Sequence, residues 1–166
     1  MNKEQLLKRI DSFNDELINM RRHIHAHPEL SGLENQTAIL ISGYLKNIGW
    51  RVKESVGRTG VVADFGPKDK GFIGLRVDMD ALPIYENTNL SFSSKIDGGM
   101  HACGHDLHTC IGLGVAKIIK ELKLKFGTRI IFQPAEEIAS GARWMIDDGV
   151  TKGLKQILGV HVFLNY

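Results

Sequence analysis

The chain has 166 residues, of which 43% are hydrophobic and 24% charged, and its formal net charge is +2. This size and composition indicate one globular domain with an apolar core and exclude a fibre or a disordered tail. Lysines and arginines are scattered without a block of like charges, so we expect no nucleic-acid partner. No apolar run is long enough to cross a membrane, and the charged N-terminal segment lacks the apolar centre of a signal peptide. We therefore expect a cytoplasmic protein with no membrane partner.

Apolar residues at helical spacing predict one helix over residues 3–25, ended by Pro28, and a second over 37–48, closed by Gly49. The rest of the chain alternates between apolar runs and helical patterns. We predict strands at 51–56, 60–65, 72–77, 128–133 and 156–162, helices at 108–122 and 140–148, and an exposed excursion at 84–100.

Helices that alternate with apolar strands predict an α/β layered domain with a mainly parallel sheet. Ligands of such sheets gather at the carboxyl ends of the strands. Asp78 and Asp80 follow the strand 72–77, Glu136 and Glu137 follow the strand 128–133, and His161 lies near the end of the last strand. Taken alone, each has a plainer reading as a strand-end carboxylate, a first-turn helix acid or a core histidine.

The segment from His101 to His108 is harder to read as plain structure, because it holds three histidines, Cys103 and one aspartate. Thiolate, imidazole and carboxylate together form the ligand set of zinc and similar ions. Cys110 falls inside a predicted helix and reads as a small buried residue.

The three histidines at 23, 25 and 27 lie in and just after the first predicted helix. His23 and His27 are four residues apart, so a helix would place them on one face. Ile24 stands where a zinc-protease motif would carry its glutamate. We therefore expect these histidines to have a structural role or to line the rim of the substrate site.

Five blocks of the chain resemble, in order, those of the aminoacylase, hippurate hydrolase and indoleacetyl-amino-acid amidohydrolase family. The blocks are Arg21–Ser31, Arg76–Pro83, Met100–Asp106, Phe132–Glu137 and Gly159–His161. The resemblance implies a zinc-exopeptidase-like fold, an α/β three-layer sandwich with a mainly parallel mixed sheet. It also implies hydrolysis of the amide bond of N-acyl amino acids.

The resemblance further implies a role for each matching residue. Cys103, His105, Glu137 and His161 would bind two divalent metal ions, with zinc favoured and manganese, cobalt and nickel as alternatives. Glu136 would be the general base, and Asp80 would orient a neighbouring ligand. Asp78 is a weaker ligand candidate, because related peptidases use histidine at the equivalent place.

Members of this family are more than twice as long. They insert a lid and dimerisation domain after the fifth block and then supply one more ligand histidine. The resemblance therefore implies that residues 1–166 are the N-terminal portion of the catalytic domain. Uncovered sheet edges invite pairing with another chain, so we expect a tendency to form a homodimer. Two alternatives stay open, a non-catalytic metal-binding remnant and a metallopeptidase that acts on short peptides.

Overall fold

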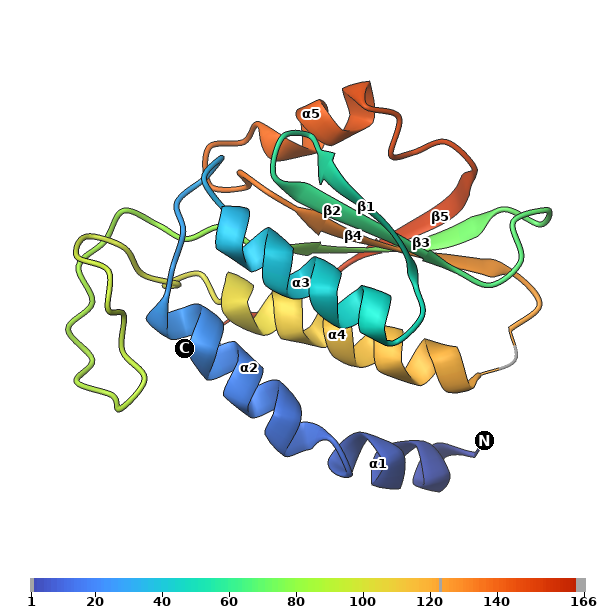
Figure 1. Ribbon diagram of the computed structural model, residues 1–166, viewed down its shortest axis with the longest axis horizontal. Helices are drawn as coiled ribbons and strands as arrows, with labels where there is room; N and C mark the ends of the chain where they lie inside the picture. The colour runs from blue at the N-terminus through green and yellow to red at the C-terminus, as the bar shows by residue number, and fades with distance from the viewer. Residues whose placement is uncertain (1, 123, 164–166) are drawn as a thin grey trace.

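The computed structural model describes residues 2–122 and 124–163, which form three helices, then three strands, and then helices and strands in alternation (Figure 1). In chain order these elements are α1 (Lys3–Asp11), α2 (Asn14–Ala26), α3 (Asn35–Asn47), β1 (Arg51–Val56), β2 (Gly60–Phe65), β3 (Phe72–Asp78), α4 (His105–Glu121), β4 (Gly127–Gln133), α5 (Gly141–Asp147) and β5 (Leu154–Gly159).

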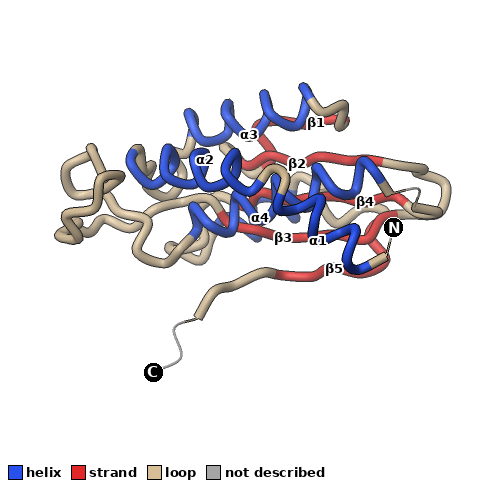
Figure 2. Tube along the Cα trace, turned by 90° about the horizontal axis from the view of Figure 1, so that it is seen from below, coloured by secondary structure: helices blue, strands red, loops and turns tan. Residues whose placement is uncertain are grey.

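The five strands form one mixed sheet in the order β1-β2-β4-β3-β5, with β1 and β5 at opposite edges (Figure 2). β2 pairs antiparallel with β1 and β4, whereas β3 pairs parallel with β4 and β5. Helices α2, α3 and α4 lie on one side of the sheet and α5 lies on the other (Figure 1). The predicted three-layer α/β architecture with a mixed sheet is therefore confirmed.

The prediction of one helix over residues 3–25 is wrong, because the chain breaks between Asp11 and Asn14 to form α1 and α2. Phe13 lies at the break and turns into the core, where it is 4% exposed. The side chain of Asn2 caps α1 in a reciprocal capping box with Gln5. Apolar spacing alone cannot show this break, since the pattern runs through it.

Two other boundaries differ from the prediction. Helix α4 begins at His105, three residues earlier than predicted, so most of the cysteine–histidine segment lies at its N-terminus. Strand β5 covers 154–159 rather than 156–162, because its ladder with β3 ends where Arg76 pairs with Gly159. His161 therefore lies beyond the strand and not within it.

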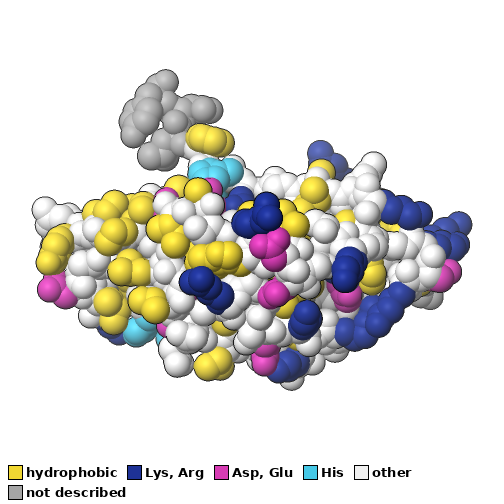
Figure 3. All heavy atoms as spheres, turned by 90° about the horizontal axis from the view of Figure 1, so that it is seen from above, with side chains coloured by type: hydrophobic (Ala, Val, Ile, Leu, Met, Phe, Trp, Pro, Cys, Tyr) yellow, Lys and Arg dark blue, Asp and Glu magenta, His cyan; other side chains and the backbone are white. Residues whose placement is uncertain are grey.

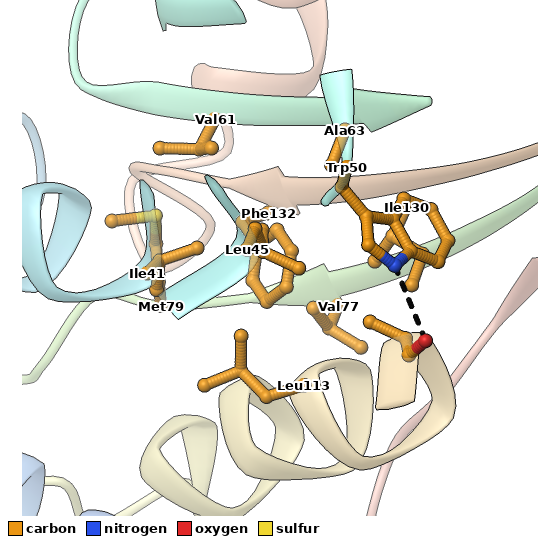
Figure 4. Close-up of a cluster of buried hydrophobic side chains, with 11 residues drawn as sticks. Ile41, Leu45, Trp50, Val61, Ala63, Val77, Met79, Leu113, Ile130 and Phe132 are labelled. Carbon is orange, nitrogen blue, oxygen red and sulfur yellow. Dashed lines mark hydrogen bonds between the residues drawn. The ribbon is translucent and has the colours of Figure 1, made fainter. Parts of the chain in front are cut away.

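The main core lies between the sheet and the helices α3 and α4 (Figure 4). Gly112 lets α4 approach the sheet closely, since a Cβ there would lie 2.9 Å from Phe132 and 3.0 Å from Val77. The indole Nε1 of Trp50 donates to the carbonyl of Ala116 at 3.2 Å, which fixes the other half of the helix. This packing sets the position of the N-terminus of α4 near the carboxyl ends of the parallel strands β3 and β4.

The segment 82–100 is irregular and exposed, as the polar, turn-rich sequence predicts. It carries four exposed apolar side chains, Ile84, Tyr85, Leu90 and Ile96. Figure 3 shows apolar side chains gathered at the end of the molecule where this segment lies. Within the described residues, no helix is long and apolar enough to cross a bilayer.

Candidate metal centre

Four pieces of the chain converge at the carboxyl ends of the three parallel strands. β3 leads into Asp80, β4 leads into Glu136 and Glu137, β5 leads into His161, and α4 begins there at His105. Three groups of possible ligands result, each with one atom per residue within 4.8 Å of the others. They are Cys103, His105 and His161; His105, Glu136 and Glu137; and Asp78, His105 and His108.

His105 is fully buried and lies at the centre of these groups. Its Nδ1 lies 2.9 Å from the backbone oxygen of Asp80, so Nδ1 is the donor, and in the neutral ring Nε2 has a free lone pair. Nε2 lies 3.7 Å from Oε1 of Glu137 and 3.8 Å from Oε2 of Glu136. Among the described residues, neither His105 Nε2 nor Glu137 Oε1 has a hydrogen-bond partner. Because buried polar atoms are nearly always paired, this imidazole and carboxylate fit a divalent ion between them.

The carboxylate of Asp80 connects this histidine to the glutamate pair. Its Oδ2 accepts hydrogen bonds from Ser31 Oγ at 2.6 Å and from the backbone N–H of Glu137 at 3.0 Å. Burial alone would raise the pKa of Asp80, but the hydrogen bonds from His105, Ser31 and the backbone of Glu137 and Glu136 together outweigh burial and lower it. A buried, ionised carboxylate that touches both His105 and the backbone of Glu137 has the geometry that an orienting role requires.

Cys103 and His161 complete the arrangement from the opposite side. Sγ of Cys103 lies 3.7 Å from Nε2 of His161, whose Nδ1 lies 2.8 Å from the backbone oxygen of Val162. That carbonyl bond leaves the lone pair of Nε2 directed at the sulfur. Burial and the nearby carboxylates, Glu137 first, raise the pKa of the Cys103 thiol to about 11. A dication at this point would reverse that effect, because a coordinating thiol is deprotonated.

The sequence analysis counted His108 in the cysteine–histidine segment but gave it no role of its own, and the structure places it fully buried beside this group. Its Nδ1 bonds Oδ1 of Asp78, and the other oxygen of Asp78 lies 2.9 Å from Nη1 of Arg76. Burial would raise the pKa of Asp78, yet His108, His105 and Arg76 together lower it. One signal was present in the sequence, because His105 and His108 are three residues apart and share one helix face.

The histidines of the first block, Arg21–Ser31, are not part of these ligand groups. His25 is buried and bonds Asp106 through Nδ1 at 2.8 Å and Glu86 through Nε2 at 3.2 Å. His23 is exposed and packs its ring 4.5 Å from that of His27. Burial lowers the pKa of His101 to about 4, so that ring is neutral. The contacts of His25 fit the structural role expected for this motif.

Comparison with known proteins places the chain in a family. The profile of peptidase family M20/M25/M40 matches residues 74–165. The chain belongs to this family, and the resemblance read from its five motifs is thereby confirmed.

Individual relatives are similar over most of this chain but extend well beyond it. The Synechocystis protein sll0100, named a probable hydrolase, is 53% identical over 89% of this chain and 38% of its own length. The N-acetylcysteine deacetylase of Bacillus subtilis is 47% identical over 90% of this chain and 40% of its own. The crystal structure of Bacillus subtilis YXEP, described as a dinuclear metal-binding peptidase of the M20 family, superposes with a TM-score of 0.87. It is 46% identical and covers 92% of this chain, while the chain covers 44% of it. This chain thus spans about two fifths of the length of these relatives.

Proposed function

We propose that this chain supplies metal ligands and the general base of a hydrolase that cleaves the amide bond of N-acyl amino acids. The observation that carries the proposal is the pair of buried, unpartnered atoms His105 Nε2 and Glu137 Oε1, 3.7 Å apart. They lie in one cluster with the Cys103–His161 pair through the shared His105. No simple structural role explains two buried ligand atoms that face each other without a hydrogen bond.

In this proposal two divalent ions, zinc in the first instance, are held by Cys103, His105, Glu137 and His161. When bound, such ions polarise the amide carbonyl and lower the pKa of water towards ~7. Asp80 keeps the ring of His105 turned so that Nε2 faces the ions. The two-metal arrangement is favoured by the description of YXEP as a dinuclear metal-binding protein.

Glu136 is the proposed general base, since it adjoins Glu137 and its side chain is 34% exposed, which leaves it open to water. It takes a proton from the attacking water while the water oxygen bonds to the acyl carbon. The carbon–nitrogen bond then breaks, and Glu136 passes the proton to the departing amine. The products are a carboxylic acid and a free amino acid.

The N-acyl amino acid substrate class is supported by the name of the 47% identical deacetylase. We further propose that residues 1–166 correspond to the N-terminal portion of a catalytic domain. The relatives carry more than half of their length outside the matched region, and in them that length is available to hold substrate. A peptidase acting on short peptides is the second candidate, because YXEP is described as a peptidase.

The first test is elemental analysis of metal in the purified protein, compared with a Cys103→Ala/Glu137→Ala double variant. We expect stoichiometric metal in the native chain and its loss in the double variant. Cys110→Ala is the matched control, because this second cysteine is buried in α4 outside the three ligand groups and should leave the metal content unchanged.

Activity is assayed in the longer protein, with N-acetyl amino acids and dipeptides as competing substrates. Glu136→Gln should retain metal and abolish hydrolysis of both. Retained hydrolysis in that variant would show that Glu136 is not the general base. Faster cleavage of dipeptides would favour the peptidase. Bound metal without hydrolysis of either substrate class would favour a non-catalytic metal-binding domain.

A further inference from the structure

We propose that His108 is a positioning residue that anchors the segment carrying His161, and that it is not itself a metal ligand. The inference rests on the proposed function only in taking His161 as a ligand. The structure carries it through one contact, in which the backbone N–H of Val162 donates to Nε2 of His108 at 3.0 Å.

Both ring nitrogens of His108 are occupied by this arrangement. Nε2 accepts from Val162, so in the neutral ring Nδ1 carries the proton and donates it to Asp78. A histidine binds a metal through a free lone pair, and this tautomer has none to spare. Asp78, His105 and His108 lie close enough to suggest a metal site, but the hydrogen bonds of His108 exclude it from ligation in this conformation.

The segment after β5 needs such an anchor. The last ladder bond to the sheet runs from the backbone N–H of Val160 to the carbonyl of Arg76 at 3.2 Å. Beyond it the side chain of His161 is exposed, and its Nδ1 bonds only the carbonyl of the next residue in the same segment. In the described chain, the bond from Val162 to His108 is therefore the one backbone hydrogen bond that ties the segment to the domain after the sheet ends.

His108 is well placed to act as a fixed point. It is fully buried, lies in the first turn of the 17-residue helix α4, and bonds the buried carboxylate of Asp78 at the end of β3. A fixed acceptor at this position holds the backbone on the C-terminal side of His161. The imidazole of His161 is thereby kept beside Cys103, 3.7 Å away, before any ion binds. Ligands held in place in advance bind metal more tightly, and loss of such support costs on the order of 10–100-fold in affinity.

The test compares two amide variants of different length. His108→Gln can place its amide oxygen near the position of Nε2 and still accept from Val162, whereas the shorter His108→Asn reaches only Asp78. We expect the Asn variant to weaken Co²⁺ affinity by on the order of 10–100-fold and the Gln variant to recover most of that loss. Competition with a chromophoric chelator measures both, and circular dichroism confirms that both variants fold.

A double-mutant cycle separates positioning from general structural damage. If His108 acts through His161, His108→Asn should weaken Co²⁺ binding no further in a His161→Ala background. Equal losses of affinity from His108→Asn with and without His161 would overturn the proposal.

A readout that does not depend on metal separates a failure of the His108 anchor from a failure of the proposed function. In ¹⁵N NMR spectra, we expect a coupling across the hydrogen bond between the Val162 amide and Nε2 of His108, with Nδ1 as the protonated ring nitrogen. Protonation at Nε2, or direct coordination of the His108 ring on addition of metal, would overturn the anchor. If the native protein bound no metal at all, the proposed function would fall, and the NMR spectra would still decide whether His108 holds the segment.

Discussion

The backbone N–H of Ala135 donates a hydrogen bond to Oε1 of Glu34 at 2.8 Å, although 101 residues separate the two. The same carboxylate accepts from the backbone N–H of Gly32 at 2.9 Å and from the hydroxyl of Thr59. Glu34 is completely buried. One carboxylate thus joins the loop before α3, the β1–β2 turn and the turn after β4 that carries the glutamate pair.

Replacement of Glu34 by alanine should therefore destabilise the fold. The buried backbone N–H of Ala135 and the partly buried N–H of Gly32 would both lose their acceptor, at about 1–3 kcal/mol each. We expect the free energy of unfolding in urea to fall by about 3 kcal/mol or more. Thr59→Val removes one donor and leaves both backbone bonds, so it should cost about 1 kcal/mol. Equal losses in the two variants would contradict this account.

Gly141 has no room for a side chain. A Cβ there would lie 1.6 Å from the backbone oxygen of Pro134, so Gly141→Ala must displace the turn that carries Glu136 and Glu137. We expect a loss of more than about 3 kcal/mol in the free energy of unfolding, together with weaker metal binding. Gly43 is the control, because it lies in α3 with no atom within 4 Å of an added Cβ. Gly43→Ala should stabilise the protein by about 0.5–1 kcal/mol.

Stability should depend on pH through His25. The hydrogen bond to Asp106 raises the pKa of His25, although burial opposes it. A raised folded-state pKa gives a contribution that is complete below the unfolded pKa of about 6.5 and is lost as the pH rises through the folded value. The difference in free energy of unfolding between the native chain and His25→Gln should therefore shrink from about pH 6 towards alkaline pH.

His23→Gln is the matched control for this measurement, since His23 is exposed on the same helix α2. It should change the free energy of unfolding little at any pH. A difference for His25→Gln that grew with rising pH would contradict the assigned sign.

Metal uptake should release protons. In the metal-free protein the pKa of Cys103 is about 11, so the group is a thiol at neutral pH, whereas a bound ion requires the thiolate. We expect zinc affinity to rise by up to about tenfold per pH unit through this one proton. Titration of zinc into weakly buffered protein measures the release directly. Cys103→Ala should abolish that proton, and zinc binding independent of pH in the native chain would exclude Cys103 as a ligand.

The convergence of the candidate ligand residues was predictable from sequence because it follows from strand topology. Carboxyl ends of parallel strands share one edge, so residues after β3, β4 and β5 had to meet there once the strands were assigned. The break at Phe13 was not predictable in this way. The break depends on a buried pocket for the Phe13 ring, where Nζ of Lys117 in α4 lies 4.9 Å from the ring centroid. Local apolar spacing carries no information about such a partner.

The roles of His108 and Glu34 were missed for a related reason. A buried polar side chain is explained by the groups it bonds, and those groups come from distant segments. Val162 is 54 residues from His108, and Ala135 is 101 residues from Glu34. Sequence reasoning finds residue types that suit a metal ion, but residues that support the ligands through backbone atoms leave no such pattern.

The order of strands also sets when the site can form during synthesis on the ribosome. β3 lies between β4 and β5, both of which are made after it. A nascent chain that has emerged only as far as α4 therefore carries Cys103 just before this helix and His105 at its start, while the supporting strand β3 has neither neighbour. Because chains emerge at about 5–20 residues per second, the interval before His161 appears lasts seconds. An ion bound during that interval would have to be held without His161, so cellular loading of the complete centre must follow the emergence of β5.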